Sequence, residues 1–458
     1  MKKKTIYKCS VCDYESIGYL GKCPVCNSWS TLVETIIDEK QKSKSESRLF
    51  EKKPIKKLEE ITTRNSHRIK SSLKEFNRVM GGGIVRDSVT ILTAKPGAGK
   101  STLLLQIAND LATKGHKILY ASGEESESQI KARADRIISE IHEKMWVVSD
   151  NSMDNLLENI DELDPDFIIV DSIQTFSLEG FPSSRPGSPT QTMECAYELV
   201  KKAKDTSRPR SIFIVGQMTK EDELAGVRAL EHLVDAVLVI EGESGEELRT
   251  LITTKNRYGS TGEMGFFNMT EEGMMSIDNP SEYFMTNREK EDLVSGSSLT
   301  VVREGTRPII VEIESLVSDS FTPYPSRISE CMRRDQLNTL ISILEQRGGI
   351  KLYDKNVVIK TTGGIKLKEH ASNLAVIISI ASSIFEIPIP NDIVFIADVG
   401  LTGELKKVPS LEARLKEVDR IGFRRAIVPY DSTKVMKDMN IEIIQLKTLK
   451  DVIRLIFN

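Results

Sequence analysis

The chain of 458 residues contains no run of 18 apolar residues, so it lacks a segment that could span a membrane as a helix. Residues 1–4 are basic, but residues 7–12 do not form the apolar core of a secretory signal. A surplus of positive charge is also missing, since 63 Lys and Arg stand against 67 Asp and Glu. The net charge of −4 excludes a wholly basic nucleic-acid coat but permits a basic channel inside an acidic ring. These absences predict a cytoplasmic protein with no membrane partner.

Cysteine is scarce, and its spacing is not that of a disulfide framework. Four of the six cysteines form two Cys-x2-Cys pairs, at Cys9, Cys12, Cys23 and Cys26. A tetrahedral Zn²⁺ ion needs four thiolates, and each pair supplies two of them from one tight turn. The alternatives are a disulfide pair, which a reducing cytoplasm disfavours, and a redox site, which would need a βαβ frame around the motif. We therefore expect a structural zinc ribbon, and we expect Cys195 and Cys331 to be ordinary packed thiols.

Residues 89–108 read as an apolar β-branched strand, a loop of small residues and then a helix that opens on Lys-Ser-Thr. This arrangement is typical of a P-loop, in which backbone N–H groups and a helix N-terminus converge on phosphate oxygens. Lys100 would neutralise the β- and γ-phosphates, and the Ser101 hydroxyl would ligate Mg²⁺. The first position is Ala94 where the usual pattern has Gly, while the strand–loop–helix context is intact. The predicted ATP-binding residues are Ala94, Lys95, Pro96, Gly97, Ala98, Gly99, Lys100, Ser101 and Thr102.

Two acidic positions complete the predicted site. Asp171 directly follows the apolar strand 167–170, which is typical of a residue that holds Mg²⁺ through a water, although a capping Asp would look the same. Glu124 and Glu125 follow the predicted strand 117–122, at the sheet edge where ligands of parallel sheets bind. We favour Glu124 as the catalytic base and Glu125 as the second choice. Both could instead cap the next helix.

The chain is too long for one hydrophobic core, so we expect several domains. They are a zinc ribbon (1–34), a lysine-rich flexible linker (35–60), a P-loop domain (61–285) and a second α/β domain (286–458). In the P-loop domain, strands alternate with helices, which predicts a mainly parallel sheet covered by helices. Its expected strands are 89–93, 117–122, 145–149, 167–170, 211–216, 236–241 and 248–254. The second domain is expected to begin with residues 297–317, to have helices at 335–346, 372–384 and 411–421, and to have strands at 357–360, 393–397, 425–429 and 441–446.

Further motifs follow in order: residues 81–83 (Gly-Gly-Gly), 122–126 (Ser-Gly-Glu-Glu-Ser), 216–220 (Gly-Gln-Met-Thr-Lys), 230–235 (Leu-Glu-His-Leu-Val-Asp) and 255–259 (Lys-Asn-Arg-Tyr-Gly). Together with the paired cysteines, the P-loop and Asp171, they resemble the bacterial RadA (also called Sms) family of DNA-recombination and repair ATPases. The resemblance covers essentially the whole chain. Its most specific part is the Lys-Asn-Arg-aromatic-Gly motif, whose aromatic residue is Tyr258 here where the family usually has Phe.

The resemblance implies a RecA-like ATPase core and a C-terminal domain like that of Lon protease. It also implies a ring, expected to be a hexamer, that moves on DNA and drives branch migration beside the RecA recombinase, with the zinc ribbon as docking module. Lys255 and Arg257 could then reach the γ-phosphate of a neighbouring subunit, or contact a DNA phosphate, or form a solvated pair. The loops 176–191 and 219–228 lie where RecA-like motors contact DNA, and their cations are Arg185, Lys220 and Arg228.

The same comparison predicts that the C-terminal domain is not a protease. Aligned with the Lon motifs, Ala371 stands where the nucleophilic Ser should be and Glu412 stands where the Lys should be. Ser372 is one residue away, a rotation of about 100° on a helix. A dyad of Ser372 with Lys406, Lys407 or Lys416 is the weaker alternative. We expect a scaffold for subunit assembly, with a DNA-binding or merely solvated basic face at Lys351, Lys355, Lys360, Arg424 and Arg425.

The leading hypothesis is thus a DNA-dependent ATPase and helicase-like motor that uses ATP, Mg²⁺ and Zn²⁺. Its candidate catalytic residues are Lys100, Glu124, Lys255 and Arg257. The alternative is an ATP-switched DNA-binding or loading adaptor that hydrolyses slowly and does not unwind DNA. The motor is favoured because a candidate base and a candidate trans-acting cation occur together, whereas a switch needs only the nucleotide pocket.

Overall fold

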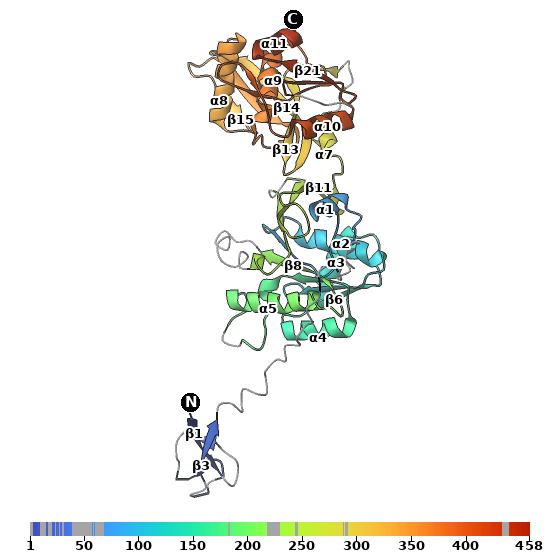
Figure 1. Cartoon of the computed structure of the whole chain (residues 1–458), viewed down its shortest axis with the longest axis vertical. Coiled ribbons are helices and arrows are strands. Elements are labelled where there is room, and N and C mark those ends of the chain that lie inside the picture. The colour runs from blue at the N-terminus through green and yellow to red at the C-terminus, as the bar shows by residue number, and fades with distance from the viewer. Residues whose placement is uncertain are drawn as a thin grey trace. The chain divides into compact units, whose positions relative to one another are not determined.

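The computed structural model describes residues 3–9, 15–16, 21–22, 24–26, 28–29, 32–38, 57, 59, 68–181, 184–217, 230–242, 246–286, 288, 292–432 and 439–458 (Figure 1). The chain divides into two compact units, Met1–Arg64 and Asn65–Asn458. In the described part of the chain, no helix combines the length and the hydropathy that crossing a bilayer requires.

The first unit contains a three-stranded antiparallel sheet in the order β2-β1-β3. Its strands are β1 (Lys3–Cys9), β2 (Glu15–Ser16) and β3 (Leu32–Asp38). β3 pairs with β1 along its whole length, from Leu32 opposite Cys9 to Asp38 opposite Lys3. The expected ribbon boundary at residue 34 therefore falls inside a strand, because cross-strand pairing continues to residue 38. Most of the expected linker 35–60 lies outside the described residues.

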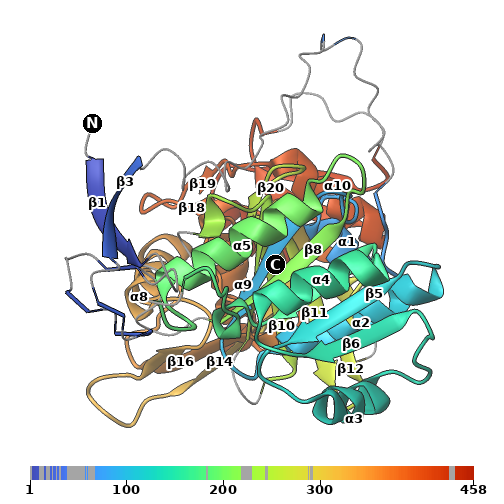
Figure 2. The same ribbon diagram turned by 90° about the horizontal axis from the view of Figure 1, so that it is seen from below.

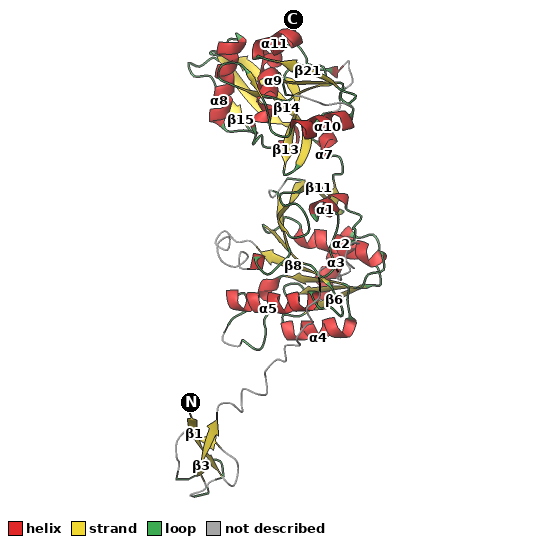
Figure 3. Cartoon of the chain, viewed as in Figure 1, coloured by secondary structure: helices red, strands yellow, loops and turns green. Residues whose placement is uncertain are grey.

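The second unit begins with a nine-stranded sheet in the order β12-β11-β10-β9-β4-β8-β7-β5-β6. Figure 3 draws the strands in yellow. The six strands from β9 to β6 are parallel, and β10, β11 and β12 extend the sheet in antiparallel fashion. The strands are β4 (Val89–Ala94), β5 (Ile118–Ser122), β6 (Met145–Ser149), β7 (Phe167–Asp171), β8 (Ser211–Gln217), β9 (Ala236–Glu241), β10 (Leu248–Asn256), β11 (Met264–Thr270) and β12 (Gly273–Ser276).

Helices cover both faces of this sheet (Figure 2). Alternate residues of β4 face opposite sides, so Leu92 packs in one hydrophobic cluster and Ile91 in another. The Leu92 cluster includes α1 (Lys74–Val79), α2 (Lys100–Thr113) and α3 (Glu127–Ile137). The Ile91 cluster includes α4 (Met153–Leu163) and α5 (Pro189–Ala203). The predicted α/β architecture with a helix-covered, mainly parallel sheet is confirmed, and every predicted strand is present within two residues at either end.

A seven-stranded sheet follows, in the order β15-β16-β14-β13-β17-β20-β21. Its strands are β13 (Ser297–Glu304), β14 (Arg307–Asp319), β15 (Arg327–Ser329), β16 (Lys355–Thr361), β17 (Ile393–Phe395), β20 (Arg425–Pro429) and β21 (Glu442–Leu446). A two-stranded sheet is formed by β18 (Asp398–Val399) and β19 (Leu405–Lys406). The helices are α7 (Pro280–Tyr283), α8 (Arg334–Ile343), α9 (Asn373–Phe385), α10 (Leu411–Ile421) and α11 (Leu449–Phe457).

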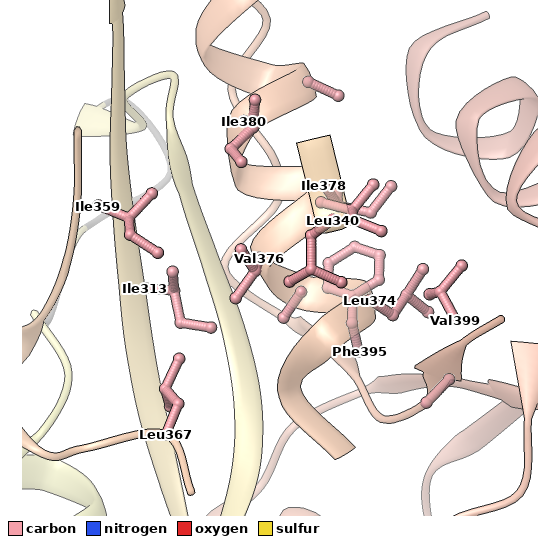
Figure 4. Close-up of a cluster of buried hydrophobic side chains, with 14 of the residues drawn as sticks. Ile313, Leu340, Ile359, Leu367, Leu374, Val376, Ile378, Ile380, Phe395 and Val399 are labelled. Carbon is pink, nitrogen blue, oxygen red and sulfur yellow. The ribbon is translucent and has the colours of Figure 1, made fainter. Parts of the chain in front are cut away.

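α9 is buried along most of its length, because it is apolar on all sides and lies in the core of this domain. Figure 4 shows this cluster, with Ile313 and Ile359 of the sheet on one side and Leu340 of α8 on the other. α7 also packs against β14, and Phe284 directly after it is fully buried in the same cluster. The expected boundary between residues 285 and 286 therefore lies just after a helix that packs against the second sheet.

Candidate functional site

The P-loop connects the buried strand β4 to the helix α2, which begins at Lys100. Gly99 has a φ of +100°, and a Cβ atom there would lie 2.4 Å from Met269 Cε and 3.1 Å from Met274 Sδ. The loop therefore needs glycine at this position for its left-handed conformation, and the β11–β12 hairpin approaches it through two flexible methionine side chains. Lys100 Nζ lies 3.0 Å from the carbonyl oxygen of Ala94, so its ammonium group folds over the loop.

Two oxygen-bearing side chains that could hold Mg²⁺ lie beside the loop. Ser101 Oγ lies 2.7 Å from Asp171 Oδ2, so the first turn of α2 meets the carboxyl end of β7. A hydroxyl and a carboxylate are the hard oxygen donors that Mg²⁺ prefers, so these two residues fit the metal that ATP brings. Ser101 and Asp171 would hold the ion, which would neutralise phosphate charge when bound.

Tyr120 of β5 also reaches this carboxylate. Its hydroxyl donates a hydrogen bond of 2.6 Å to Asp171 Oδ2. Burial and the neighbouring Asp171 charge raise the pKa of Tyr120 well above its usual range, which keeps the hydroxyl protonated. Sequence reasoning missed this residue, although the alternation along β5 puts it on the same side of the strand as Ser122, directly before the Glu124 motif.

Glu124 lies at the same sheet edge and accepts a hydrogen bond from the Ser172 hydroxyl. Its charge also acts on Lys100, whose pKa is lowered by burial and raised in part by Asp171 and Glu124. Glu125 instead pairs with Arg133, whose Nη1 lies 2.6 Å from its Oε2. The alternative that both acids cap the following helix is wrong, because α3 is capped by Ser126 in a capping box with Gln129.

The P-loop opens into a pocket of about 880 Å³. Besides P-loop residues, its walls include Arg133 and Arg136 of α3 and Met269 and Glu271 near the β11–β12 hairpin. Sequence reasoning found neither α3 nor the hairpin as part of the site. Arginines on an exposed helical face and a short antiparallel hairpin carry no phosphate-binding signature, and only the folded sheet brings them to the P-loop.

Lys255 and Arg257 lie at the opposite edge of the sheet, where the parallel strands begin. β10 runs antiparallel to β9, so Asn256 pairs with Ala236, which in turn pairs with Thr90 at the start of β4. The P-loop follows the opposite end of β4, and six residues of strand span roughly 20 Å. The two cations are therefore far from the P-loop of their own chain.

Both cations have partners at that edge. Lys255 Nζ donates to the backbone carbonyl of Glu231, and Arg257 Nη1 lies 3.2 Å from Asp235 Oδ1. Asp235 is almost fully buried, and its other oxygen accepts a 3.0 Å hydrogen bond from Val89 N. Both cations therefore contact the segment before β9, although half of the Arg257 side chain is exposed.

The glycine run at residues 81–83 meets the same motif. Arg68 Nη1 donates to the carbonyl oxygens of Met80 and Gly83 at 3.0 and 3.2 Å, and Arg68 Nη2 donates to the carbonyl of Tyr258. Gly83 has a φ of +127°, and a Cβ atom there would lie 2.6 Å from the Ile69 carbonyl oxygen. Two motifs that are more than 170 residues apart thus form one structure at the edge opposite the P-loop.

Two family models match the chain, an AAA domain at residues 56–204 and a rubredoxin metal binding domain at residues 7–34. The DNA repair protein RadA of Bacillus subtilis is 43% identical over 432 residues, which is 93% of each chain. The protein of the same name from Streptococcus pyogenes serotype M3 is 38% identical over 458 residues, 100% of both chains. That from Listeria monocytogenes is 37% identical over 456 residues, 99% of this chain and 98% of the relative.

The chain belongs to the RadA family. Membership confirms the resemblance seen in the motifs and supports a role in DNA repair. The AAA domain, together with the Ser101–Asp171 pair, supports an ATPase that uses ATP and Mg²⁺.

The rubredoxin-type match includes all four cysteines of the expected zinc site. Cys9 Sγ and Cys26 Sγ, one from each pair, lie 3.6 Å apart. That separation is too long for a disulfide, whose sulfur atoms are about 2.05 Å apart. It is close to the roughly 3.8 Å between two sulfurs that bind one Zn²⁺ tetrahedrally at 2.3 Å. Cys12 and Cys23 lie outside the described residues, and the two thiols that are described fit zinc.

At the positions of the Lon motifs, this RadA-family chain has two buried residues and one surface residue. Ala371 is buried, and the fully buried Ser372 donates its hydroxyl to the Glu369 carbonyl at 3.1 Å. Glu412 forms an ion pair with Lys416 on the surface of α10. A hydroxyl buried in this way has no access to a peptide substrate, which argues against the Ser372 dyad.

The candidate DNA-contacting cations differ in their surroundings. Arg185 is exposed, whereas Lys220 and Arg228 lie outside the described residues. Of the five basic residues proposed for the C-terminal face, three are paired with carboxylates: Lys355 with Asp319, Lys360 with Glu314, and Arg425 with Asp392. Pairing lowers the positive potential of this face, so it is a weaker candidate for DNA phosphates than its sequence indicates.

Proposed function

We propose that this protein is a DNA-dependent ATPase and helicase-like motor that drives branch migration of recombination intermediates beside the RecA recombinase in the cytoplasm. It would act as a homo-oligomeric ring of six subunits, with the zinc ribbon docking the partner. Lys100 and Ser101 would bind Mg²⁺·ATP, Glu124 would activate the attacking water, and Lys255 and Arg257 would complete the site of the neighbouring subunit.

The observation that carries the proposal is the separation of the two halves of the site. The P-loop, Asp171 and Glu124 lie at one edge of the nine-stranded sheet, whereas Lys255 and Arg257 lie at the other. A cation that stabilises charge on the γ-phosphate must approach it closely, and these two cannot do so within their own chain. A neighbouring copy can supply them, and sites shared between copies couple hydrolysis to movement in a ring.

The first test measures unwinding of forked DNA with ATP for the wild type, Lys100→Ala and Arg257→Ala, with ATP hydrolysis recorded in the same samples with and without single-stranded DNA. We expect both variants to lose unwinding. Arg257→Lys is the matched control, since it keeps the positive charge beside the buried Asp235. DNA binding with slow hydrolysis and no unwinding by the wild type would refute the motor.

Mixing the two inactive variants tests the shared site directly. A Lys100→Ala subunit keeps its cations, and an Arg257→Ala subunit keeps its P-loop, so some interfaces in a mixed ring are complete. We expect hydrolysis to recover partly on mixing. No recovery, together with a loss of DNA binding by Arg257→Ala alone, would assign Arg257 to DNA contact instead.

The second candidate function is an ATP-switched DNA-binding or loading adaptor that does not unwind DNA. One observation favours it: Lys255 and Arg257 are both engaged with residues 231–235 of their own chain. If these contacts are structural, Arg257→Ala lowers the unfolding temperature and leaves the hydrolysis rate per folded subunit unchanged. The motor requires a lower hydrolysis rate per folded Arg257→Ala subunit.

A further inference from the structure

Tyr120 is a buried residue beside the ATP site that none of the sequence motifs includes. It lies in the middle of β5, its side chain is 1% exposed, and its neighbours along the strand are buried. Phenylalanine would fill the same space in this core. The hydroxyl, however, is aimed at Asp171 Oδ2, 2.6 Å away.

Two donors meet on this one carboxylate oxygen. Ser101 Oγ donates to Asp171 Oδ2 from the first turn of α2, and the Tyr120 hydroxyl donates to the same atom from β5. Two hydrogen bonds from different elements fix the rotation of a carboxylate that a single bond would leave free. Ser101 is also the residue type that ligates Mg²⁺ in a P-loop, whereas Tyr120 is enclosed in the core.

We propose that Tyr120 is a positioning residue that holds the Asp171 carboxylate in the orientation needed to receive Mg²⁺·nucleotide. It acts through Asp171 and touches neither the nucleotide nor the metal. Its effect is confined to the part of nucleotide affinity that depends on Mg²⁺. The inference rests on the ATP site alone, so it stands or fails independently of DNA unwinding.

The test compares the full-length wild type with Tyr120→Phe in equilibrium titrations with a fluorescent ADP analogue. Each protein is titrated once in EDTA and once in saturating Mg²⁺, and the ratio of the two dissociation constants is the readout. We expect Tyr120→Phe to reduce the Mg²⁺-dependent gain in nucleotide affinity about tenfold, since one hydrogen bond to a charged group is lost. In EDTA its affinity should equal that of the wild type. Mn²⁺ bound to the nucleotide complex, measured by electron paramagnetic resonance, gives a second readout.

Asp171→Asn shows whether the effect passes through the carboxylate. Adding Tyr120→Phe to Asp171→Asn should cause no further loss of the Mg²⁺ ratio. Tyr197→Phe, the same chemical change on α5, should leave the ratio unchanged. A further tenfold loss of the Mg²⁺ ratio in the Asp171→Asn background would overturn the proposal. An equal loss of nucleotide affinity in EDTA and in Mg²⁺ would overturn it too. A lower unfolding temperature with an unchanged ratio would assign Tyr120 to packing and would overturn it as well.

Discussion

Replacing Arg307 by Met should destabilise the Asn65–Asn458 unit, because it leaves a buried carboxylate without its charge partner. Arg307 of β14 forms an ion pair with Glu75 of α1, with Nη1 lying 2.8 and 2.7 Å from the two carboxylate oxygens. Glu75 is 3% exposed, and it also accepts a 3.0 Å hydrogen bond from Phe266 N. The pair therefore joins a helix of the first α/β domain to a strand of the second.

The size of the effect follows from this burial. Removing one partner of a buried ion pair costs about 3–5 kcal/mol, since the remaining charge keeps its desolvation penalty. Burial raises the pKa of Glu75, and Arg307 acts in the opposite direction. Without Arg307 this pKa rises further. A carboxyl group with a raised folded-state pKa contributes stability that is present below its unfolded pKa of about 4.3 and lost as pH rises through the folded value.

Urea unfolding near pH 5 and near pH 8 measures both parts of this prediction. Arg307→Met should lose more free energy of unfolding at the higher pH, where the stranded Glu75 must be charged. The double variant Glu75→Gln/Arg307→Met should recover most of the loss, since no buried charge remains. Lys131→Met, which removes a cation from an exposed ion pair with Asp135, is the control and should change little. An equal loss at both pH values, or a double variant as unstable as Arg307→Met, would refute the reasoning.

Three further predictions concern the ATP site and the ribbon. Lys100→Ala should abolish ATP hydrolysis without lowering the unfolding temperature, as enzyme assay and thermal unfolding together will show. Glu124→Gln should reduce the hydrolysis rate about 10²–10⁴-fold while ATP binding persists, because a general base contributes that much; weaker binding in proportion to the lost rate would count against a base. Cys9→Ser should release zinc, measured by metal analysis, and leave basal hydrolysis intact, and a loss of hydrolysis would show that the ribbon is not independent.

The nucleotide site could be predicted largely from the sequence, because one part is a local motif and the other parts follow parallel strands. Residues 94–102 run from the end of a strand through a loop into a helix, and Asp171 and Glu124 lie at the ends of strands whose carboxyl ends meet at one edge. Local spacing and the parallel topology are enough to place them together. Tyr120 and Arg133 were missed, because an aromatic residue in a strand and an arginine on a helix are ordinary in any α/β domain.

The antiparallel extension of the sheet was only partly predictable. The strand 248–254 was predicted and is β10, whereas β11 and β12 were not foreseen. Sequence alone also could not say which way β10 runs relative to β9, because a strand pattern has no direction in a sheet. That direction decides where Lys255 and Arg257 lie, and it is set by pairing with β9 and by the Asp235 contacts.

The sequence by itself determined the class of protein and the chemistry of its ATP site. A P-loop, paired cysteines and ordered motifs are local patterns, and each is compatible with few structures and functions. Only the tertiary structure decided that the two halves of the candidate catalytic set lie at opposite edges of one sheet. It also decided that Tyr120 supports Asp171 and that the Ser372 hydroxyl is buried. Each of these depends on contacts between segments far apart in the chain, and such contacts are formed by strand pairing and side-chain burial when the whole domain packs.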